Sequence, residues 1–185
     1  MRKILRVIPY LVACWALLPS PPANAQKNPQ VQPVPNVPPT QNAIKDAPGF
    51  PGKGKKDDWQ KATVLFNEGI DLAAAKKYPE AIKKYNAAIA KYAYDPVMFA
   101  NLGFALEKTS EPKAGEAACR KAIALDKEFG GAWENLGNCL YDQGKLEESR
   151  DAFNGALKCE LKLTKRNELL HVVDVLNDQI KKAHK

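Results

Sequence analysis

The chain contains few histidine and cysteine residues, two types that often catalyse reactions or bind metals. Its 185 residues include two histidines, His171 and His184, and four cysteines. The sequence has no Cys-x-x-Cys pair, no haem-attachment motif, no glycine-rich phosphate loop and no HExxH motif. These absences argue against an enzyme, and we expect no catalytic residue, no metal site and no cofactor.

The excess of positive charge is also small outside the N-terminus. The whole chain carries 28 basic and 21 acidic residues, a formal net charge of +7. Three of the basic residues, Arg2, Lys3 and Arg6, lie among the first 25 positions, and the other basic residues are mixed with Asp and Glu. A mixed surface of this kind is typical of solvated helices, so we do not expect a nucleic-acid partner.

The N-terminus has an apolar segment that is too short for an ordinary membrane span. The segment covers residues 7–18, which makes it shorter than the roughly 20 residues that a membrane-spanning helix needs. They follow the basic start and precede Ala23-Asn24-Ala25, a small-x-small pattern typical of signal-peptidase sites. We therefore expect a cleaved signal peptide at 1–25, a periplasmic or secreted protein, and no membrane insertion after processing. Two alternatives stay open: a membrane lipoprotein with a lipid anchor on Cys14, and an uncleaved anchor.

Residues 26–57 are rich in proline and poor in large apolar side chains. Such a segment buries too little surface to offset the entropy of ordering, so we expect a disordered linker with polyproline character. It would serve as a spacer or, alternatively, as a proline-rich ligand. Seven prolines define it: Pro29, Pro33, Pro35, Pro38, Pro39, Pro48 and Pro51.

Downstream of the linker, glycine recurs at a fixed interval. Gly69, Gly103 and Gly137 are each 34 residues apart. A period of this length is the signature of a stacked-repeat architecture. The neighbouring positions repeat in the same register, alternating large and small residues: Leu65, Phe99 and Trp133; Asn67, Asn101 and Asn135; Leu72, Leu106 and Leu140; Ala81, Gly115 and Ser149; Tyr85, Cys119 and Phe153; Ala88, Ala122 and Ala156.

The spacing within each repeat predicts two helices that pack closely. Positions i, i+4 and i+7 place Leu65, Gly69 and Leu72 on one helical face, and the second helix repeats this pattern around Tyr85. Each repeat is therefore expected to be a helical hairpin, and such hairpins must stack to bury their apolar faces. Helix starts are expected at Tyr78-Pro79-Glu80, Asp95-Pro96 and Ser110-Glu111-Pro112, with Asp95 and Ser110 as N-caps.

The third repeat carries a family resemblance. The segment from Trp133 to Tyr141 resembles the tetratricopeptide repeat pattern W-x2-L-G-x2-Y, and the segment from Phe99 to Leu106 is similar. The first repeat departs at Glu68, where the family usually has Leu. The family's late proline is replaced by Ala93, Lys127 and Leu161. The resemblance implies an all-α, right-handed superhelix at 58–163, with hairpins at 62–95, 96–129 and 130–163.

A capping helix and tail are expected at 164–185. The apolar residues Leu169, Val172, Val173, Leu176 and Ile180 share one face of this amphipathic segment, which would cover the last hairpin. Its opposite face carries His171, Asp174, Asn177, Asp178 and Lys181.

The resemblance implies a concave groove, lined by the first helix of each hairpin, that binds a protein or peptide partner. Members of the family that bind chaperone tails grip a terminal carboxylate with basic residues. Here those slots hold Phe66, Gly131 and Asn135, which makes the groove apolar and amide-rich. The repeated asparagines would either clamp an extended peptide or set the repeat spacing. The candidate lining residues are Phe66, Asn67, Ile70, Val97, Asn101, Phe104, Glu134, Asn135, Asn138 and Tyr141.

Three cysteines follow the linker, each in a slot that is usually apolar. Cys119, Cys139 and Cys159 are interpreted as small buried hydrophobic residues. In an oxidising compartment a disulfide between Cys119 and Cys139 is the alternative, because their helices would be neighbours.

The sequence as a whole favours an exported adaptor of a bacterial cell envelope that binds its partner in the groove. The rival interpretation is a structural spacer or assembly subunit that works through its convex face or the ends of the array.

Overall fold

The computed structural model describes residues 56–159 and 162–184. The expected signal peptide, almost all of the linker, and Cys14 lie outside these residues. The described part of the chain contains helices and no strand. The helices are α2 (Lys56–Ala74), α3 (Tyr78–Lys91), α4 (Pro96–Lys108), α5 (Pro112–Leu125), α6 (Gly130–Asp142), α7 (Leu146–Lys158) and α8 (Leu163–Ala183).

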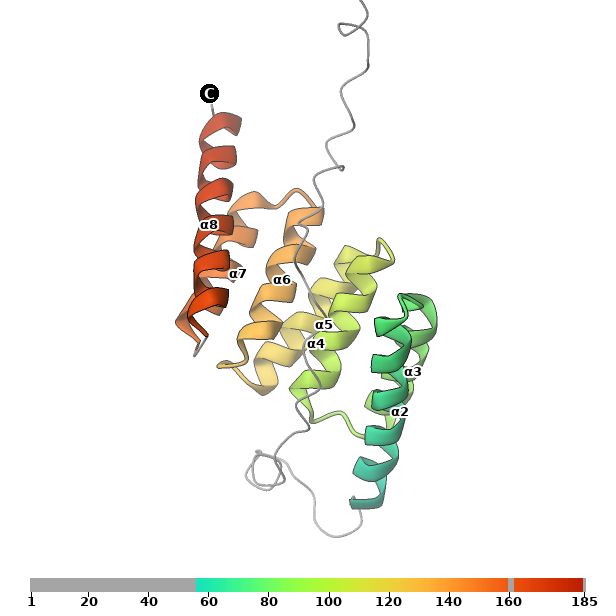
Figure 1. The fold of residues 1–185 in the computed structure, drawn as a ribbon. Helices are drawn as coiled ribbons and strands as arrows, with labels where there is room; N and C mark the ends of the chain where they lie inside the picture. The colour runs from blue at the N-terminus through green and yellow to red at the C-terminus, as the bar shows by residue number, and fades with distance from the viewer. Residues whose placement is uncertain (1–55, 160–161, 185) are drawn as a thin grey trace, which may run out of the picture. The chain divides into compact units, whose positions relative to one another are not determined.

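Consecutive helices pair into three hairpins, α2–α3, α4–α5 and α6–α7, which stack on one another (Figure 1). The second helix of each hairpin packs against the first helix of the next, as α3 does with α4 and α5 with α6. Helix α8 packs against α7 at the end of the stack. This arrangement confirms the predicted all-α superhelix of three hairpins and a capping helix.

Two of the predicted helix starts agree with the structure and one differs in its cap. Helix α3 begins at Tyr78, and the N-terminus of α4 is capped by Asp95, whose Oδ1 accepts a hydrogen bond from the Val97 amide at 2.8 Å. Helix α5 begins at Pro112, but its N-cap is Glu111, which makes no side-chain cap bond. Ser110 instead belongs to the preceding turn, so its prediction as an N-cap is wrong.

The turn inside each hairpin has a residue in the left-handed region at the same register position. The φ angles are 58° at Lys76, 64° at Ser110 and 74° at Gly144. In each turn the following amide bonds back to a leucine carbonyl, as in the bond from Lys145 to Leu140 at 3.0 Å. This is the helix C-terminal motif that favours glycine, because a Cβ is strained at positive φ. Only the third turn has the favoured glycine. In the first two turns, Lys76 and Ser110 place a side chain at this strained position.

The repeated glycines are close-contact points between the two helices of each hairpin. A Cβ at Gly69 would lie 2.5 Å from the Tyr85 ring, and one at Gly137 would lie 2.8 Å from the Phe153 ring. Real Cβ atoms essentially never come this close. The predicted close approach of the two helices is therefore present, and the Phe153 ring is the group that a Cβ at Gly137 would meet first.

The three cysteines are free thiols inside the core. Cys119 and Cys139 are fully buried, and Cys159 is 3% exposed. A hydrogen bond with Cys119, together with burial, raises the pKa of the Cys139 thiol above its usual range. The alternative of a disulfide between Cys119 and Cys139 is therefore not realised in this structure, and both side chains pack as small apolar residues.

Helix α8 covers the last hairpin with one face. Leu169, Val173 and Leu176 are buried in a cluster with Phe153 and Ala156 of α7. On the other face, His171, Asp174, Asp178 and Lys181 are exposed, as expected of a capping helix. Across the described helices, none is both long and apolar enough to cross a membrane.

Candidate functional site

The predicted groove residues differ widely in how much surface they offer to a partner. Asn67 is exposed, and Ile70, Val97, Glu134 and Tyr141 are half-buried. The other five side chains are buried: Phe66, Asn101, Phe104, Asn135 and Asn138. Five of the ten predicted groove residues are thus accessible to a partner. The other five lie inside the fold beneath them.

The two phenylalanines are used in contacts between helices. The Phe66 ring lies 5.6 Å from the Tyr85 ring of its own hairpin. The Phe104 ring packs edge-on against Tyr78 at 6.0 Å, which joins the first hairpin to the second. Lys108 lies over the same Phe104 ring at 5.2 Å. Both rings are 3% exposed, so their apolar area stabilises the scaffold beneath the groove.

The asparagines at the repeat interval do not occupy equivalent environments. The Nδ2 of Asn135 donates to the Ala100 carbonyl at 3.0 Å and thereby ties α6 to α4. The Nδ2 of Asn101 donates to Val97 on its own helix at 2.9 Å. Asn67 is exposed on α2. The equal spacing therefore does not give a ladder of three surface amides, and the bond made by Asn135 is of the kind that sets repeat spacing.

Two buried amide atoms next to these bonds have no hydrogen-bond partner. They are the Oδ1 acceptor of Asn101 and the Nδ2 donor of Asn138. Asn138 is 8% exposed and lies one turn after Glu134 on α6. An unpaired buried polar atom costs about 1–3 kcal/mol, so these two atoms lower the stability of the packing around α4 and α6.

A group of charged residues near the ends of α4 and α6 was missed by the sequence analysis. Burial raises the pKa of Glu107; Lys108 counteracts this, and the neighbouring Asp142 carboxyl raises it further. The Lys108 Nζ lies 2.9 Å from the Glu107 Oε2. The helical register could have indicated Asp142, because this residue stands one turn after the predicted groove residue Asn138 and therefore shares its helical face.

A separate set of ion pairs joins α8 to the N-terminal part of α6. The Nζ of Lys165 lies 2.9 Å from the Glu134 Oε1 and 3.5 Å from the Glu168 Oε2. Burial lowers the pKa of Lys165, but its bonds with Glu134 and Glu168 outweigh burial and raise it overall. Glu134 thus already has a cation.

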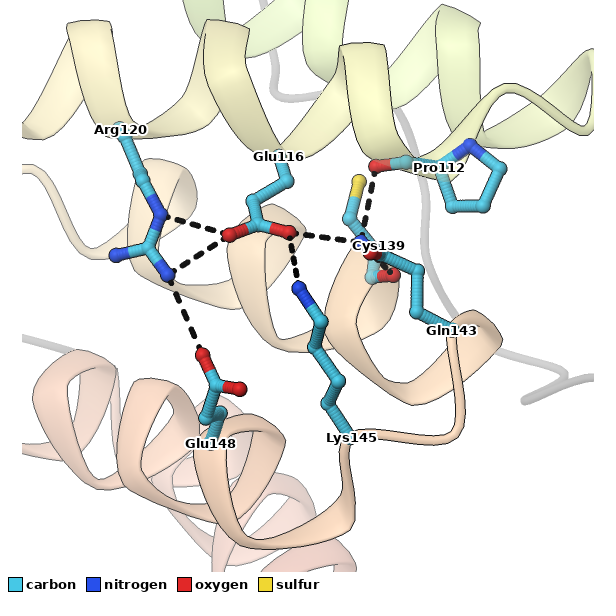
Figure 2. A network of polar contacts seen from close by, with 7 residues as sticks. All are labelled: Pro112, Glu116, Arg120, Cys139, Gln143, Lys145 and Glu148. Atoms are coloured by element: carbon cyan, nitrogen blue, oxygen red, sulfur yellow. Dashed lines mark hydrogen bonds and ion pairs between the residues drawn. The ribbon is translucent and has the colours of Figure 1, made fainter.

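A second polar network joins α5 to the turn between α6 and α7 (Figure 2). The Glu116 Oε2 accepts from Gln143 at 2.9 Å and pairs with the Lys145 Nζ at 3.0 Å. Its Oε1 pairs with Arg120 at 2.8 Å, and Arg120 also reaches Glu148 at 3.6 Å. Burial opposes ionisation of Glu116, but the bonds from Gln143, Lys145 and Arg120 prevail and lower its pKa to about 2.

A hollow of about 620 Å³ adjoins this network between two inter-helix turns. None of the predicted groove residues lines it. Its lining residues are Ser110, Glu111, Pro112, Lys113, Ala114, Gln143 and Lys145. Within the described residues, no group of three or more His, Cys, Asp or Glu side chains is arranged to hold a metal ion.

Part of the helical region is similar in sequence to a known family of repeat proteins. Residues 101–160 match the tetratricopeptide repeat family model. The small glutamine-rich tetratricopeptide repeat-containing protein 2 of Mycosarcoma maydis is 29% identical over 104 residues, 56% of this chain and 30% of the relative. RNA polymerase II-associated protein 3 of Mus musculus is 31% identical over 107 residues, 58% of this chain and 16% of the relative. The chain thus spans less than a third of the length of these curated relatives.

Two solved domains with bound peptides are similar in fold and sequence. The first TPR of Spaghetti (RPAP3), bound to HSP90 peptide SRMEEVD, is 25% identical with a TM-score of 0.62, covering 66% of this chain and 95% of that one. The second TPR of the same protein, bound to the same peptide, is 27% identical with a TM-score of 0.56, covering 58% and 98%. The Yersinia enterocolitica chaperone SycD, at 14% identity and a TM-score of 0.63, is similar in fold alone.

The comparisons contradict the expected periplasmic or secreted location. The curated relatives named above are eukaryotic, as is the Hsp70-Hsp90 organizing protein of Triticum aestivum, which is 27% identical over 72% of this chain. Eukaryotic cells have no periplasm, so these relatives point away from a bacterial envelope. They also give no support to a lipid anchor on Cys14. The family model over 101–160 and the peptide-bound relatives together support the tetratricopeptide repeat family for this chain.

Proposed function

We propose that the helical region binds a protein or peptide partner along the first helices α2, α4 and α6. The observation that carries this proposal is the likeness to two domains with bound peptide, which the chain covers over 95% and 98% of their length. In this proposal the chain acts by reversible docking as a non-catalytic adaptor, and no bond is made or broken.

The accessible part of the predicted lining would make the contacts. Ile70, Val97 and Tyr141 are half-buried, so each keeps some apolar surface on a preformed scaffold. A tyrosine combines a large apolar ring with a polar hydroxyl and is often a dominant contact in interfaces. The five buried residues would act indirectly, by holding the first helices at fixed separations.

The ligand is expected to differ from the peptides seen in the relatives. The peptide SRMEEVD has two glutamates and ends in aspartate. The slots in which the family carries basic residues for a terminal carboxylate hold Phe66, Gly131 and Asn135 here. We therefore expect this chain to bind SRMEEVD much more weakly than a peptide chosen for its own groove.

A peptide array tests the proposal on the full chain. Heptapeptides with one position randomised at a time are screened, and the best binder is measured by fluorescence polarisation. Tyr141→Ala should weaken binding about tenfold, because a central aromatic contact is lost. The matched control is Val64→Ala on α2, a residue that is 59% exposed and outside the predicted lining. Binding that tolerates Tyr141→Ala and Val97→Asp but fails in Val64→Ala would move the function to the end of the array.

A further inference from the structure

We propose that α8 contributes a fourth helix to the peptide groove and binds an apolar side chain of the partner through Val172 and Val175. This inference rests on the proposed peptide-binding function and extends its surface from the first helices to the capping helix. The occupant is a large aliphatic or aromatic residue near one end of the bound peptide, because α8 lies at one end of the array.

Covering the last hairpin uses only one stripe of α8. The buried residues of that stripe, Leu169, Val173 and Leu176, pack against α7. With 3.6 residues in each turn, Val172 and Val175 lie beside this stripe rather than within it. Val172 is half-buried and Val175 is 43% exposed. Capping the array therefore does not account for the apolar side chain of Val175.

An ion pair identifies the side of α8 that is turned towards the first helices. The Lys165 Nζ lies 2.9 Å from the Oε1 of Glu134, a predicted groove residue of α6. Lys165, Val172 and Val175 fall within about 80° of one another around the helix axis, because each residue advances the helix by about 100°. Glu168, which also pairs with Lys165, lies within the same sector. The side of α8 that carries both valines is therefore the side that adjoins α6.

A second predicted groove residue of α6 lies against the same apolar cluster as α8. Tyr141 is half-buried and packs on the buried cluster that α7 and α8 share. Val172 packs on this cluster too, and Val175 follows Val172 by three residues, so the two valines are neighbours on the helix surface. Apolar surface thus continues from Tyr141 on α6 to both valines on α8. Such surface favours an apolar partner residue, since burying it away from water stabilises the complex.

The charged groups between α6 and α8 pair with one another. Lys165 binds Glu134 and also lies 3.5 Å from the Oε2 of Glu168. A partner carboxylate would meet these two glutamates, and a partner ammonium would compete with Lys165 for them. An apolar residue covers the valines and leaves both ion pairs intact. The surface therefore selects an apolar side chain over a charged one.

Two exposed apolar residues of α8 provide a matched pair of variants. Val175 lies on the side that adjoins α6, whereas Leu170, which is 47% exposed, lies beyond the opposite edge of the buried stripe. The full chain is titrated by fluorescence polarisation with the tightest-binding heptapeptide from the array. Val175→Asp should weaken binding about tenfold, and Leu170→Asp less than about twofold.

Circular dichroism verifies that both aspartate variants are folded. If either is not, Val175→Ala and Leu170→Ala replace the pair. The alanine at position 175 should then weaken binding about threefold, because only part of the apolar contact is removed, and the alanine at position 170 should leave binding unchanged.

A double-mutant cycle identifies the partner residue. Each apolar position of the heptapeptide is replaced by alanine in turn, and each peptide is measured with the wild type and with Val175→Asp. At one position near an end of the peptide, alanine should weaken binding to the wild type about tenfold but to Val175→Asp less than about threefold, because the contact is already lost. Independent effects at every position would overturn the inference.

The outcomes separate this inference from the proposed function. If Tyr141→Ala weakens binding while Val175→Asp keeps the wild-type affinity, the peptide docks on the first helices and α8 has no part in it. Equal losses in Val175→Asp and Leu170→Asp would also overturn the inference, because the effect would not be specific to one side of α8. If no peptide on the array binds, the proposed function fails and this inference fails with it.

Discussion

The Nδ2 of Asn135 donates a hydrogen bond to the main-chain carbonyl of Ala100, which lies 35 residues earlier in the chain. The bond joins α6 to α4, and Asn135 is only 3% exposed. A polar side chain is thus used at the junction of two hairpins, where an apolar residue would leave the carbonyl without this partner.

We expect Asn135→Ala to destabilise the protein by about 0.5–1.5 kcal/mol, because the hydrogen bond between α6 and α4 is lost while the Ala100 carbonyl keeps its bond within α4. Asn101→Ala, the same register position one repeat earlier, should cost less, since its amide bonds to its own helix at Val97. Urea unfolding of both variants measures the difference. Equal costs would show that the bond between helices contributes little.

Gly137→Leu should destabilise the protein by about 1–3 kcal/mol or more through overpacking. The first added carbon would lie 2.8 Å from the Phe153 ring, so α6 and α7 must move apart. Thermal unfolding monitored by circular dichroism tests this. Ala90→Leu adds a similar side chain at an exposed position of α3 and serves as the control. If Gly137→Leu had the melting temperature of the wild type, the two helices of the hairpin would accommodate the added side chain without loss of stability.

Ser110→Gly should stabilise the protein by about 0.5–1 kcal/mol, because glycine adopts the φ of 64° without strain. Gly144→Ser should produce the opposite change at the equivalent turn, where φ is 74°. Both are measured by urea unfolding. Ser110→Ala keeps the strained Cβ and controls for loss of the hydroxyl. If Ser110→Ala raises the free energy of unfolding as much as Ser110→Gly does, backbone strain does not explain the stabilisation.

Acid should weaken the junction between α5 and the third hairpin. The pKa of Glu116 is lowered in the folded state to about 2 from a usual value of 4.5. Its stabilising effect is therefore complete above about pH 4.5 and is lost as pH falls towards 2. Urea unfolding of Glu116→Gln should show a smaller pH dependence over this window than the wild type. Glu148→Gln, which removes a 55%-exposed and more distant partner of Arg120, should keep the wild-type profile.

The hairpin scaffold was predictable because packing repeats at fixed chain intervals. The spacing of Gly69, Gly103 and Gly137 predicted close contacts between helices. The apolar face of α8 predicted that this helix covers the last hairpin. Exposure was not predictable in the same way. Equal spacing places Asn67, Asn101 and Asn135 at equivalent register positions, but the neighbouring helices then bury two of them and leave Asn67 exposed.

Other features arise from contacts between residues that no single motif contains. The Glu107–Asp142 pair depends on how α4 meets α6, and the Glu116 network depends on where the α6–α7 turn falls. The strained turns were predictable in part. Lys76 and Ser110 precede Gly144 by whole repeat intervals, so the turn glycine of the third repeat marks the equivalent positions in the other two. The location was predicted wrongly because it was inferred from residues 1–25, separate from the helices that the relatives match.

The two junctions between hairpins differ in chemistry, so solvent conditions should act on them differently. The first relies in part on the apolar contact of Tyr78 with Phe104. The second combines an apolar cluster between α5 and α6 with the ionic network around Glu116. Apolar contacts weaken on cooling, whereas removing the Glu116 charge requires acid. Acid would thus loosen the array at its C-terminal hairpin, whereas cold would weaken the apolar contacts of both junctions. A bound partner spanning all three hairpins would oppose both.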